Sequence, residues 1–305
     1  MANMMVIGFA VDGTSARRFA KALGVGYLDI IRHQFPDGET RITLPTRLPE
    51  QLIIYQSLND PNAKLVELLL AAKTARRNGV KHLTLVAPYL CYMRQDVAFS
   101  PGEAISQTIV GEWLAQHFDA LLTVDPHLHR VHRLVDAVPV KNAITLSAAT
   151  AIGEFLRDKR RQFVLIGPDQ ESEQWVSVAA AAAGCAFGVC QKVRHADRET
   201  TVTLPDIDAT GADVVLVDDI ASSGGTLMSA ARACVAAGAA SVNAAITHAL
   251  FDDVAAAELK RAGIAQIWST DTVVHATNVI SLAALTAAGF RNFVQYPQGT
   301  QGPSA

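Results

Sequence analysis

Short, continuous apolar segments alternate with segments of helical spacing along most of the chain, and this alternation limits the possible folds more than any other feature. Residues 4–10, 82–87 and 214–217 are examples of such apolar segments. A strand that is apolar at successive positions is buried on both faces, as happens when helices cover both sides of a parallel sheet. The sequence therefore predicts an α/β protein with doubly wound, mostly parallel sheets.

The individual elements follow from the same alternation and from local turn and capping signals. A hairpin is expected over residues 30–44, because a Pro-Asp-Gly turn separates two segments of strand character. Helices should begin at polar capping residues or at a proline and end at a glycine. The other expected strands are residues 52–56, 120–124, 163–167, 242–247, 267–269 and 273–274, and the expected helices run from Thr14 or Ser15 to Gly24 and over residues 59–79, 103–117, 147–157, 173–183 and 226–237.

The domain organisation follows from the length and from a restart of the pattern. A chain of 305 residues is long enough for two domains. The alternation of strand and helix begins again near residue 145. We therefore expect two similar domains, an N-terminal one over residues 1–145 and a C-terminal one over residues 146–305. The polar tail, residues 298–305, is rich in Gly and Pro and is expected to be mobile.

Composition and charge argue against several classes of protein. Half of the residues are hydrophobic and 18% are charged, unlike a disordered chain. The net charge of −3 argues against bulk electrostatic binding of nucleic acid. No apolar run is long enough for a membrane span, and the first residues lack the charged start of a signal peptide. The four cysteines form no C-x-x-C pair, so we expect a cytoplasmic protein with reduced thiols.

Residues 214–226 carry the most specific chemical signal, with the sequence V-V-L-V-D-D-I-A-S-S-G-G-T. A buried strand leads here through a small-residue loop into a helix, whose N-terminus carries partial positive charge. The glycines let backbone N–H groups approach an anion, and the two carboxylates suit sugar hydroxyls or a metal on the ligand. The alternative is a tight turn whose acidic pair caps the helix. The predicted sugar-phosphate site comprises Asp218, Asp219, Ser222, Ser223, Gly224, Gly225 and Thr226.

This segment closely resembles the phosphoribosyl diphosphate motif of type I phosphoribosyltransferases and of ribose-phosphate diphosphokinases. The resemblance implies two domains of phosphoribosyltransferase type. It also implies that Asp218 and Asp219 meet the ribose hydroxyls and that the small-residue loop holds the 5-phosphate. The motif alone does not separate enzymes that consume the activated sugar from enzymes that make it.

A second segment, in the first half of the chain, separates these two classes. The sequence P-Y-L-C-Y-M-R-Q-D at residues 88–96, followed by G-E-A-I-S at residues 102–106, resembles the nucleotide loop of ribose-phosphate diphosphokinases. The resemblance implies that Arg94, Gln95 and Asp96 bind ATP. The planar guanidinium of arginine suits a polyphosphate oxygen or the adenine edge. Without the neighbouring matches, an R-Q-D triplet would be interpreted as a solvated loop.

The predicted hairpin carries F-P-D-G-E at residues 35–39, which resembles the F-x-D-G-E hairpin of the same family. In that family the hairpin reaches the adenine of ATP bound to a neighbouring subunit. The resemblance implies that Phe35 stacks on the base and that Asp37 and Glu39 accept its amino hydrogens. We therefore expect a homo-oligomer with shared active sites. The alternative for Phe35 is a buried aromatic at the tip of the hairpin.

Two further segments resemble the metal-positioning residues of the family. His127, in a D-P-H segment with Asp125, matches a histidine that helps to position metal and triphosphate. Asp169, in a G-P-D segment, matches an aspartate near the ribose and the metal. The resemblance implies Mg²⁺ as the cofactor, with His127 and Asp169 as its protein contacts. The nearby His129 and His132 have no counterpart in the family and are interpreted as surface or packing residues.

Lys192 and Arg194 resemble the mobile K-x-R loop of the family, which closes on the triphosphate. Two cations there would stabilise the charge on the transferred diphosphoryl group. Lys192, Arg194 and His127 are therefore the expected catalytic residues. Considered alone, a lysine and an arginine two positions apart would be interpreted as solvated side chains.

Together these segments predict a ribose-phosphate diphosphokinase. Such an enzyme transfers the β,γ-diphosphoryl group of ATP to the C1 hydroxyl of ribose 5-phosphate, giving phosphoribosyl diphosphate and AMP. Residues 170–175, with the sequence Q-E-S-E-Q-W, depart from the glycines of the family. Two alternatives therefore stay open: a homologue that acts on another sugar phosphate, and a regulatory homologue that binds nucleotide without turnover. A phosphoribosyltransferase is disfavoured, because it needs no ATP hairpin.

Overall fold

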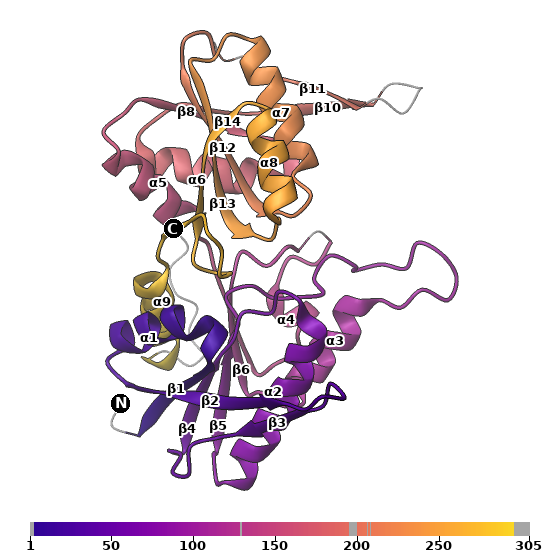
Figure 1. The fold of residues 1–305 in the computed structure, drawn as a ribbon, viewed down its shortest axis with the longest axis vertical. Coiled ribbons are helices and arrows are strands. Elements are labelled where there is room, and N and C mark those ends of the chain that lie inside the picture. The colour runs from indigo at the N-terminus through magenta and orange to yellow at the C-terminus, as the bar shows by residue number, and fades with distance from the viewer. Residues whose placement is uncertain (1–2, 129, 195–199, 206, 208, 296–305) are drawn as a thin grey trace. The chain divides into compact units, whose positions relative to one another are not determined.

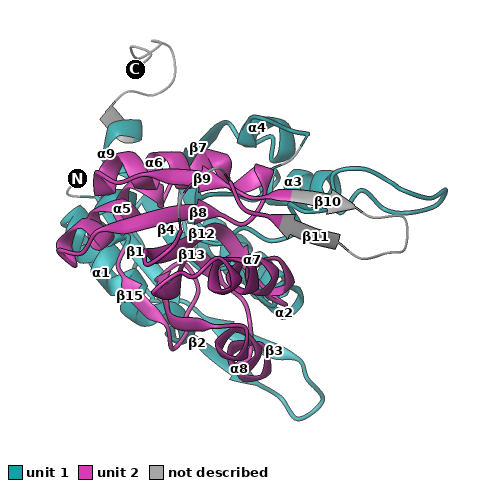
Figure 2. Ribbon diagram, turned by 90° about the horizontal axis from the view of Figure 1, so that it is seen from above, with its two compact units in different colours: residues 1–146, 282–305 teal, residues 147–281 magenta. Residues whose placement is uncertain are grey.

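The chain folds into two compact units, which Figure 2 shows in different colours. Unit 1 comprises Met1–Leu146 together with Leu282–Ala305, and unit 2 comprises Ser147–Ser281. The structure is a computed structural model (Figure 1), and it describes residues 3–128, 130–194, 200–205, 207 and 209–295. The predicted mobile tail, residues 298–305, lies outside the described residues.

Unit 1 is built on a seven-stranded sheet in the order β3-β2-β1-β4-β5-β6-β7. Neighbouring strands are parallel, except that β2 and β3 form the predicted antiparallel hairpin. The strands are β1 (Met4–Phe9), β2 (Gly26–Gln34), β3 (Thr40–Thr43), β4 (Gln51–Tyr55), β5 (His82–Val86), β6 (Ala120–Val124) and β7 (Asn142–Leu146), and the helices are the 3-10 turn η1 (Ala10–Asp12), α1 (Gly13–Leu23), α2 (Pro61–Arg77), α3 (Ser106–Ala115), α4 (Leu134–Ala137) and α9 (Ala283–Gln295).

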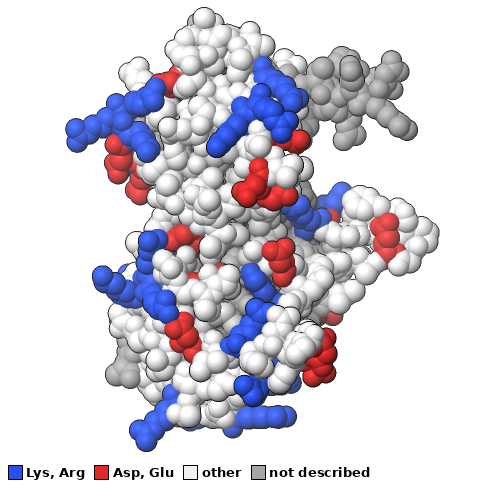
Figure 3. Space-filling view, in the orientation of Figure 1, with Lys and Arg blue, Asp and Glu red and all other residues white. Residues whose placement is uncertain are grey.

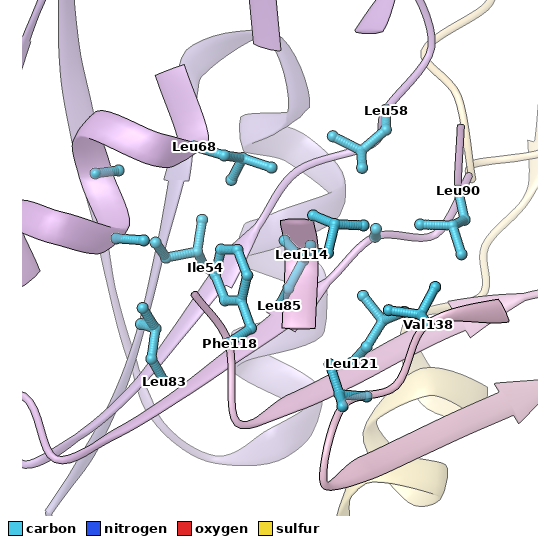
Figure 4. Packing of buried hydrophobic residues seen from close by; sticks show 14 of the residues in the cluster. Ile54, Leu58, Leu68, Leu83, Leu85, Leu90, Leu114, Phe118, Leu121 and Val138 are labelled. Carbon is cyan, nitrogen blue, oxygen red and sulfur yellow. The ribbon is translucent and has the colours of Figure 1, made fainter. Parts of the chain in front are cut away.

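Apolar side chains pack on both faces of this sheet. On one face Leu68 of α2 and Leu114 of α3 belong to the same buried cluster as Ile54 of β4 (Figure 4). On the other face Phe19 of α1 packs against Tyr55 of β4, with the ring centroids 5.6 Å apart. Burial on both faces explains why these strands are apolar at successive positions, and it confirms the predicted α/β architecture.

Unit 2 has a six-stranded sheet in the order β15-β14-β13-β12-β8-β9, in which all neighbouring strands are parallel. A separate antiparallel pair is formed by β10 and β11. The strands are β8 (Phe163–Gly167), β9 (Phe187–Val189), β10 (Gln191–Arg194), β11 (Thr200–Thr203), β12 (Asp213–Ala221), β13 (Ser241–Ala249), β14 (Ile264–Thr270) and β15 (Asn278–Ile280), and the helices are α5 (Ala149–Asp158), the 3-10 turn η2 (Gln170–Ser172), α6 (Glu173–Ala183), α7 (Gly225–Ala236) and α8 (Asp253–Arg261).

The last helix, α9, does not belong to the unit that precedes it. It packs on α1, where the ring of Phe290 meets Phe19 edge-to-face at 6.3 Å and Arg291 donates a hydrogen bond of 2.7 Å to the carbonyl of Ala22. A Cβ atom at Gly289 would lie 2.6 Å from a side-chain carbon of Leu146, so glycine permits this close approach. The prediction of a C-terminal domain over residues 146–305 is therefore wrong beyond Ser281, because α9 covers one face of the unit 1 sheet.

Several local predictions also need correction. Residues 273–274 form no strand, and β15 follows at Asn278–Ile280 instead. Helix α1 begins at Gly13, with Asp12 rather than Thr14 or Ser15 as its N-cap. Helix α3 begins at Ser106, three residues after the predicted start at Glu103. The strands β7, β9, β10 and β11 are not predicted, because these short segments lack the continuous apolar run that identifies the central strands.

Positive and negative side chains are interspersed on the face of the molecule shown in Figure 3. This mixture agrees with the net charge of −3. Within the described part of the chain, none of the helices combines the length and the apolar character that crossing a membrane requires.

Candidate active site

The predicted sugar-phosphate residues lie at the carboxyl end of β12, in the middle of the unit 2 sheet. Strand β12 runs to Ala221, four residues beyond its predicted end, so Asp218 and Asp219 are part of the strand. Asp219 is buried, and its N–H donates a hydrogen bond of 3.0 Å to the Asp218 carboxylate. In parallel sheets this end of the strands is where ligands bind.

Three carboxylates influence one another at this edge. Burial, reinforced by the neighbouring carboxylates of Asp219 and Asp169, raises the pKa of Asp218 well above its usual range. Asp169 follows β8, which pairs directly with β12. Its carboxylate also accepts the N–H of Ser172 in a capping box at the start of η2. Concentrated negative charge of this kind is stabilised by a cation or by hydroxyl donors of a ligand.

Two glycines with different constraints lie where the small-residue loop after β12 enters α7. Gly224 has a φ of 73°, and a Cβ atom there would lie 2.9 Å from the side chain of Leu259, so both backbone and packing require glycine. At Gly225, the first residue of α7, a Cβ atom would lie no closer than 3.9 Å to its nearest neighbour, Ser223 Oγ. The N-cap residue of α7 is Gly224, which has no side chain to cap the helix, so the N–H groups of its first turn can bind an anion.

Lys192 and Arg194 lie on β10, and their backbones pair with Val202 and Thr200 of β11. The family resemblance implies a loop at this position, whereas the structure has a strand of a hairpin. The N–H of Cys190, which precedes β10, donates a hydrogen bond of 2.8 Å to the carbonyl of Gly167 at the end of β8. The base of the hairpin is therefore attached next to Asp169. The side chains of Lys192 and Arg194 lie outside what the structure describes.

In unit 1 the predicted ATP hairpin forms a tight turn between β2 and β3. The N–H of Phe35 donates to the carbonyl of Glu39 at 2.8 Å, and the N–H of Glu39 donates to the Asp37 carboxylate at 3.1 Å. The Phe35 ring is 38% exposed, and it meets the ring of His33 edge-to-face at 4.8 Å. Phe35 is therefore not the buried aromatic of the alternative interpretation, since one part of its ring faces solvent.

The nucleotide loop after β5 places its three predicted residues differently. Arg94 is exposed and Gln95 is half-buried. The Asp96 side chain is only 1% exposed and accepts hydrogen bonds from the backbone N–H and the guanidinium of Arg130, at 3.1 and 2.7 Å. Burial opposes its ionisation, but the bonds to Arg130 outweigh burial and lower the pKa of Asp96. The Asp96 carboxylate is therefore held by Arg130, and its contact with ATP stays a prediction.

The loop after β6 carries His127, which is half-buried. Asp125 is buried with a φ of 36°, and Tyr92 after β5 has a φ of 60°. Non-glycine residues in this region are strained, and such residues cluster at functional sites. His132 is exposed and His129 lies outside the described residues. Among the described residues, no group of three or more His, Cys, Asp or Glu side chains is placed to hold a metal ion.

A buried polar cluster at the same edge of unit 1 was missed. Asp12 follows β1, and its carboxylate accepts the N–H of Ser57, which follows β4, at 3.3 Å. Burial raises the pKa of Asp12 to about 6, although Lys64 and the Ser57 N–H oppose this shift. Lys64 of α2 donates to the Ser57 carbonyl and to Asn59, each at 2.8 Å. Asp12 and Ser57 each follow a strand, but neither belongs to a motif, so the sequence alone does not indicate the cluster.

Comparisons with known proteins show the family of the chain. The family model described as the N-terminal domain of ribose phosphate pyrophosphokinase matches residues 4–117, and the phosphoribosyl transferase domain matches residues 138–282. A ribose-phosphate pyrophosphokinase of Methanopyrus kandleri is 32% identical over 95% of this chain and 99% of its own. The chain belongs to the ribose-phosphate pyrophosphokinase family. Ribose-phosphate pyrophosphokinase 2 of Archaeoglobus fulgidus is 36% identical over 89% of this chain and 94% of its own.

A solved structure supports the fold of this ribose-phosphate pyrophosphokinase homologue. The phosphoribosylpyrophosphate synthetase of Mycobacterium smegmatis matches with a TM-score of 0.80 and 23% identity, covering 96% of this chain and 99% of that one. The family and the fold class predicted from the sequence are therefore confirmed, and so is the prediction of an ATP-dependent diphosphotransferase. The match of an N-terminal pyrophosphokinase domain also argues against a phosphoribosyltransferase.

Proposed function

We propose that this member of the family transfers the β,γ-diphosphoryl group of ATP to the C1 hydroxyl of ribose 5-phosphate. A bond forms between the C1 oxygen and the β-phosphorus, and the bond from the β-phosphorus to the α,β-bridging oxygen breaks. AMP leaves, and the hydroxyl proton passes to solvent. The observation that carries the proposal is the match of residues 4–117 to the N-terminal domain of ribose phosphate pyrophosphokinase. The acidic end of β12, followed by the glycine loop and the start of α7, would hold the sugar phosphate.

The sugar phosphate would bind across this segment. Asp218 and Asp219 would accept hydrogen bonds from the ribose hydroxyls, which would also relieve the repulsion between the carboxylates. The 5-phosphate would lie against the N–H groups of α7, with Gly224 and Gly225 allowing its close approach. Ser222, Ser223 and Thr226 would add hydroxyl donors.

Mg²⁺ suits the donor set at this edge. Carboxylate oxygens are hard ligands, and Mg²⁺ is commonly held by one or two carboxylates together with substrate phosphates and water. Asp169 is the carboxylate we propose for this role in unit 2, and His127 would help to place the metal and the triphosphate. Bound Mg²⁺ would neutralise charge on the phosphate oxygens.

ATP would be bound by residues of unit 1. Phe35 would stack on adenine, with Asp37 and Glu39 as acceptors for its amino group, and Arg94, Gln95 and Asp96 would contact the nucleotide. Lys192 and Arg194 would stabilise the charge that develops on the transferred group. We further propose a homo-oligomer with shared active sites, and a cytoplasmic location, which the four free thiols support.

The departure at residues 170–175 favours one second candidate. The segment forms η2 and the start of α6, and it places the exposed side chains of Glu171 and Glu173 close in sequence to Asp169. Added negative charge there could change the sugar phosphate that binds.

The deciding experiment measures AMP formation by the full chain with ATP, Mg²⁺ and ribose 5-phosphate. We expect AMP and phosphoribosyl diphosphate in equal amounts. A panel of other sugar phosphates tests the second candidate, which requires faster turnover with one of them. ATP binding without AMP release from any sugar phosphate would overturn the proposal and favour the regulatory homologue.

A further inference from the structure

The hairpin that carries Phe35 extends away from the core of unit 1. In the outer half of β2, each residue from Ile31 to Gln34 is exposed, and Ile31 is 63% exposed. On the facing strand β3, Ile42 packs partly against the buried cluster. A two-stranded hairpin of this kind is marginally stable by itself, so its direction depends on contacts with the rest of the unit.

One such contact is an ion pair between β2 and α2. Arg32 Nε lies 2.7 Å from Glu67 Oε1, and the Glu67 side chain is only 5% exposed. A second nitrogen of the Arg32 guanidinium donates to the side-chain oxygen of Gln34 at 3.0 Å. Gln34 is the residue before Phe35. The Arg32 side chain therefore connects a buried carboxylate of α2 to the base of the turn that presents Phe35.

Helix α2 is itself fixed to the carboxyl edge of the sheet. Lys64, three residues before Glu67, donates to the Ser57 carbonyl and to the side chain of Asn59. Asn62 accepts a hydrogen bond from the hydroxyl of Tyr92, in the nucleotide loop. The Glu67 carboxylate therefore belongs to a part of α2 that is held in place, in contrast to a carboxylate on a flexible surface side chain.

We propose that Glu67 is a positioning residue for ATP, which acts through Arg32 to fix the direction of the hairpin and thereby the place of Phe35. The inference rests on the proposed function, since it assigns the hairpin to the adenine. Glu67 itself does not contact the substrate. Its effect comes from holding a stacking ring within a fraction of an ångström of its binding position.

The test compares Glu67→Gln, Arg32→Met and the double variant in the AMP-forming assay. Glu67→Gln keeps the volume of the side chain and removes its charge, and the half-exposed Arg32 can then turn to water. Arg32→Met leaves a buried carboxylate without its partner, so it should lower the melting temperature more than Glu67→Gln does. If the pair positions Phe35, each variant raises the KM for ATP about tenfold and leaves the KM for ribose 5-phosphate unchanged.

Further variants distinguish positioning from stability. The double variant should raise the KM for ATP no more than one single variant does, because both remove the same contact. Arg32→Lys, which keeps the charge, should restore part of the affinity. Asp29→Asn is the matched control, because it breaks an exposed ion pair of 2.7 Å between Arg17 and the same strand and should leave both KM values unchanged.

The inference is overturned if the variants lower the melting temperature while the KM for ATP stays at the wild-type value. It is also overturned if the KM values for both substrates rise together. Failure of the proposed function has a different signature, since wild-type protein would then form no AMP.

Discussion

The predicted sugar-phosphate residues of unit 2 lie together at residues 218–226, whereas the predicted ATP residues of unit 1 come from residues 35–39 and 94–96. The first set needs only a strand, a glycine loop and a helix, and neighbouring residues supply all three. The second set contacts side chains elsewhere in unit 1, since Glu67 pairs with Arg32 of the hairpin and Arg130 pairs with Asp96 of the nucleotide loop. The residues of a contiguous predicted site are thus placed by their own strand, loop and helix. Site residues from separate segments are each held by contacts with other parts of the unit.

The largest expected effect separates binding from turnover. Arg194 is proposed to stabilise charge on the transferred diphosphoryl group, so Arg194→Ala should lower turnover about a thousandfold. Because Arg194 lies on β10, outside residues 218–226, the Kd for ribose 5-phosphate should stay unchanged. Rapid-quench assays and calorimetry would measure the two quantities. The exposed Arg232 of α7 provides the control, because Arg232→Ala should change neither. Unchanged turnover in Arg194→Ala would show that β10 does not contact the transferred group.

The next effect tests the contiguous segment. At Gly225 a Cβ atom would be in ordinary van der Waals contact with Ser223 Oγ, so Gly225→Val should keep the fold while the Kd for ribose 5-phosphate rises about a hundredfold. Gly224→Ala is the matched variant, because its φ of 73° and the contact with Leu259 should cost about 1–3 kcal/mol of stability. Tight sugar binding by Gly225→Val would place the 5-phosphate elsewhere.

A smaller effect is expected where a dispersed element loses its anchor. Asp96→Asn removes the charge that binds Arg130, and the free energy of unfolding should fall by about 2 kcal/mol. Because the nucleotide loop loses its attachment, the KM for ATP should rise, while sugar binding in unit 2 stays unchanged. Urea unfolding and steady-state kinetics check this, with the exposed pair Arg133–Asp136 as the control for a surface interaction. Equal stability of Asp96→Asn and wild type would contradict the assigned anchor.

Local signals in the sequence predicted much of the fold. The apolar strand at residues 214–217 and the helix end at Gly24, which has a φ of 79°, depend on nearest neighbours and on backbone geometry. The packing of α9 on α1 does not depend on neighbouring residues, because Phe290 and Phe19 are far apart in the sequence and belong to segments on either side of unit 2. The same holds for Asp96, whose partner Arg130 lies 34 residues further along the chain.

The candidate site shows the same limit. The motif at residues 218–226 could be predicted as one piece, including its acidic pair. Asp169 interacts with Asp218 because β8 pairs with β12, and the sequence does not predict which strands pair. Asp12 and Lys64 were missed because a lone carboxylate and a lone lysine carry no signal until burial brings them near Ser57.

The smallest expected effect is a dependence of the free energy of unfolding on pH. It tests whether the buried Asp12 carboxylate contributes to the stability of unit 1. The pKa of Asp12 is raised to about 6 in the folded protein, so the folded state binds its proton more tightly than the unfolded chain does. The resulting stabilisation is fully present below the ordinary pKa of an aspartate and is lost as the pH rises through about 6. Between pH 5 and pH 7 the free energy of unfolding should therefore fall by about 1 kcal/mol through this group. Urea unfolding at both pH values should show that the fall is reduced in Asp12→Asn and kept in Asp158→Asn, which alters an exposed carboxylate of unit 2. If wild type and Asp12→Asn respond equally to pH, the Asp12 carboxylate is solvated, and the polar cluster is not an anchor of unit 1.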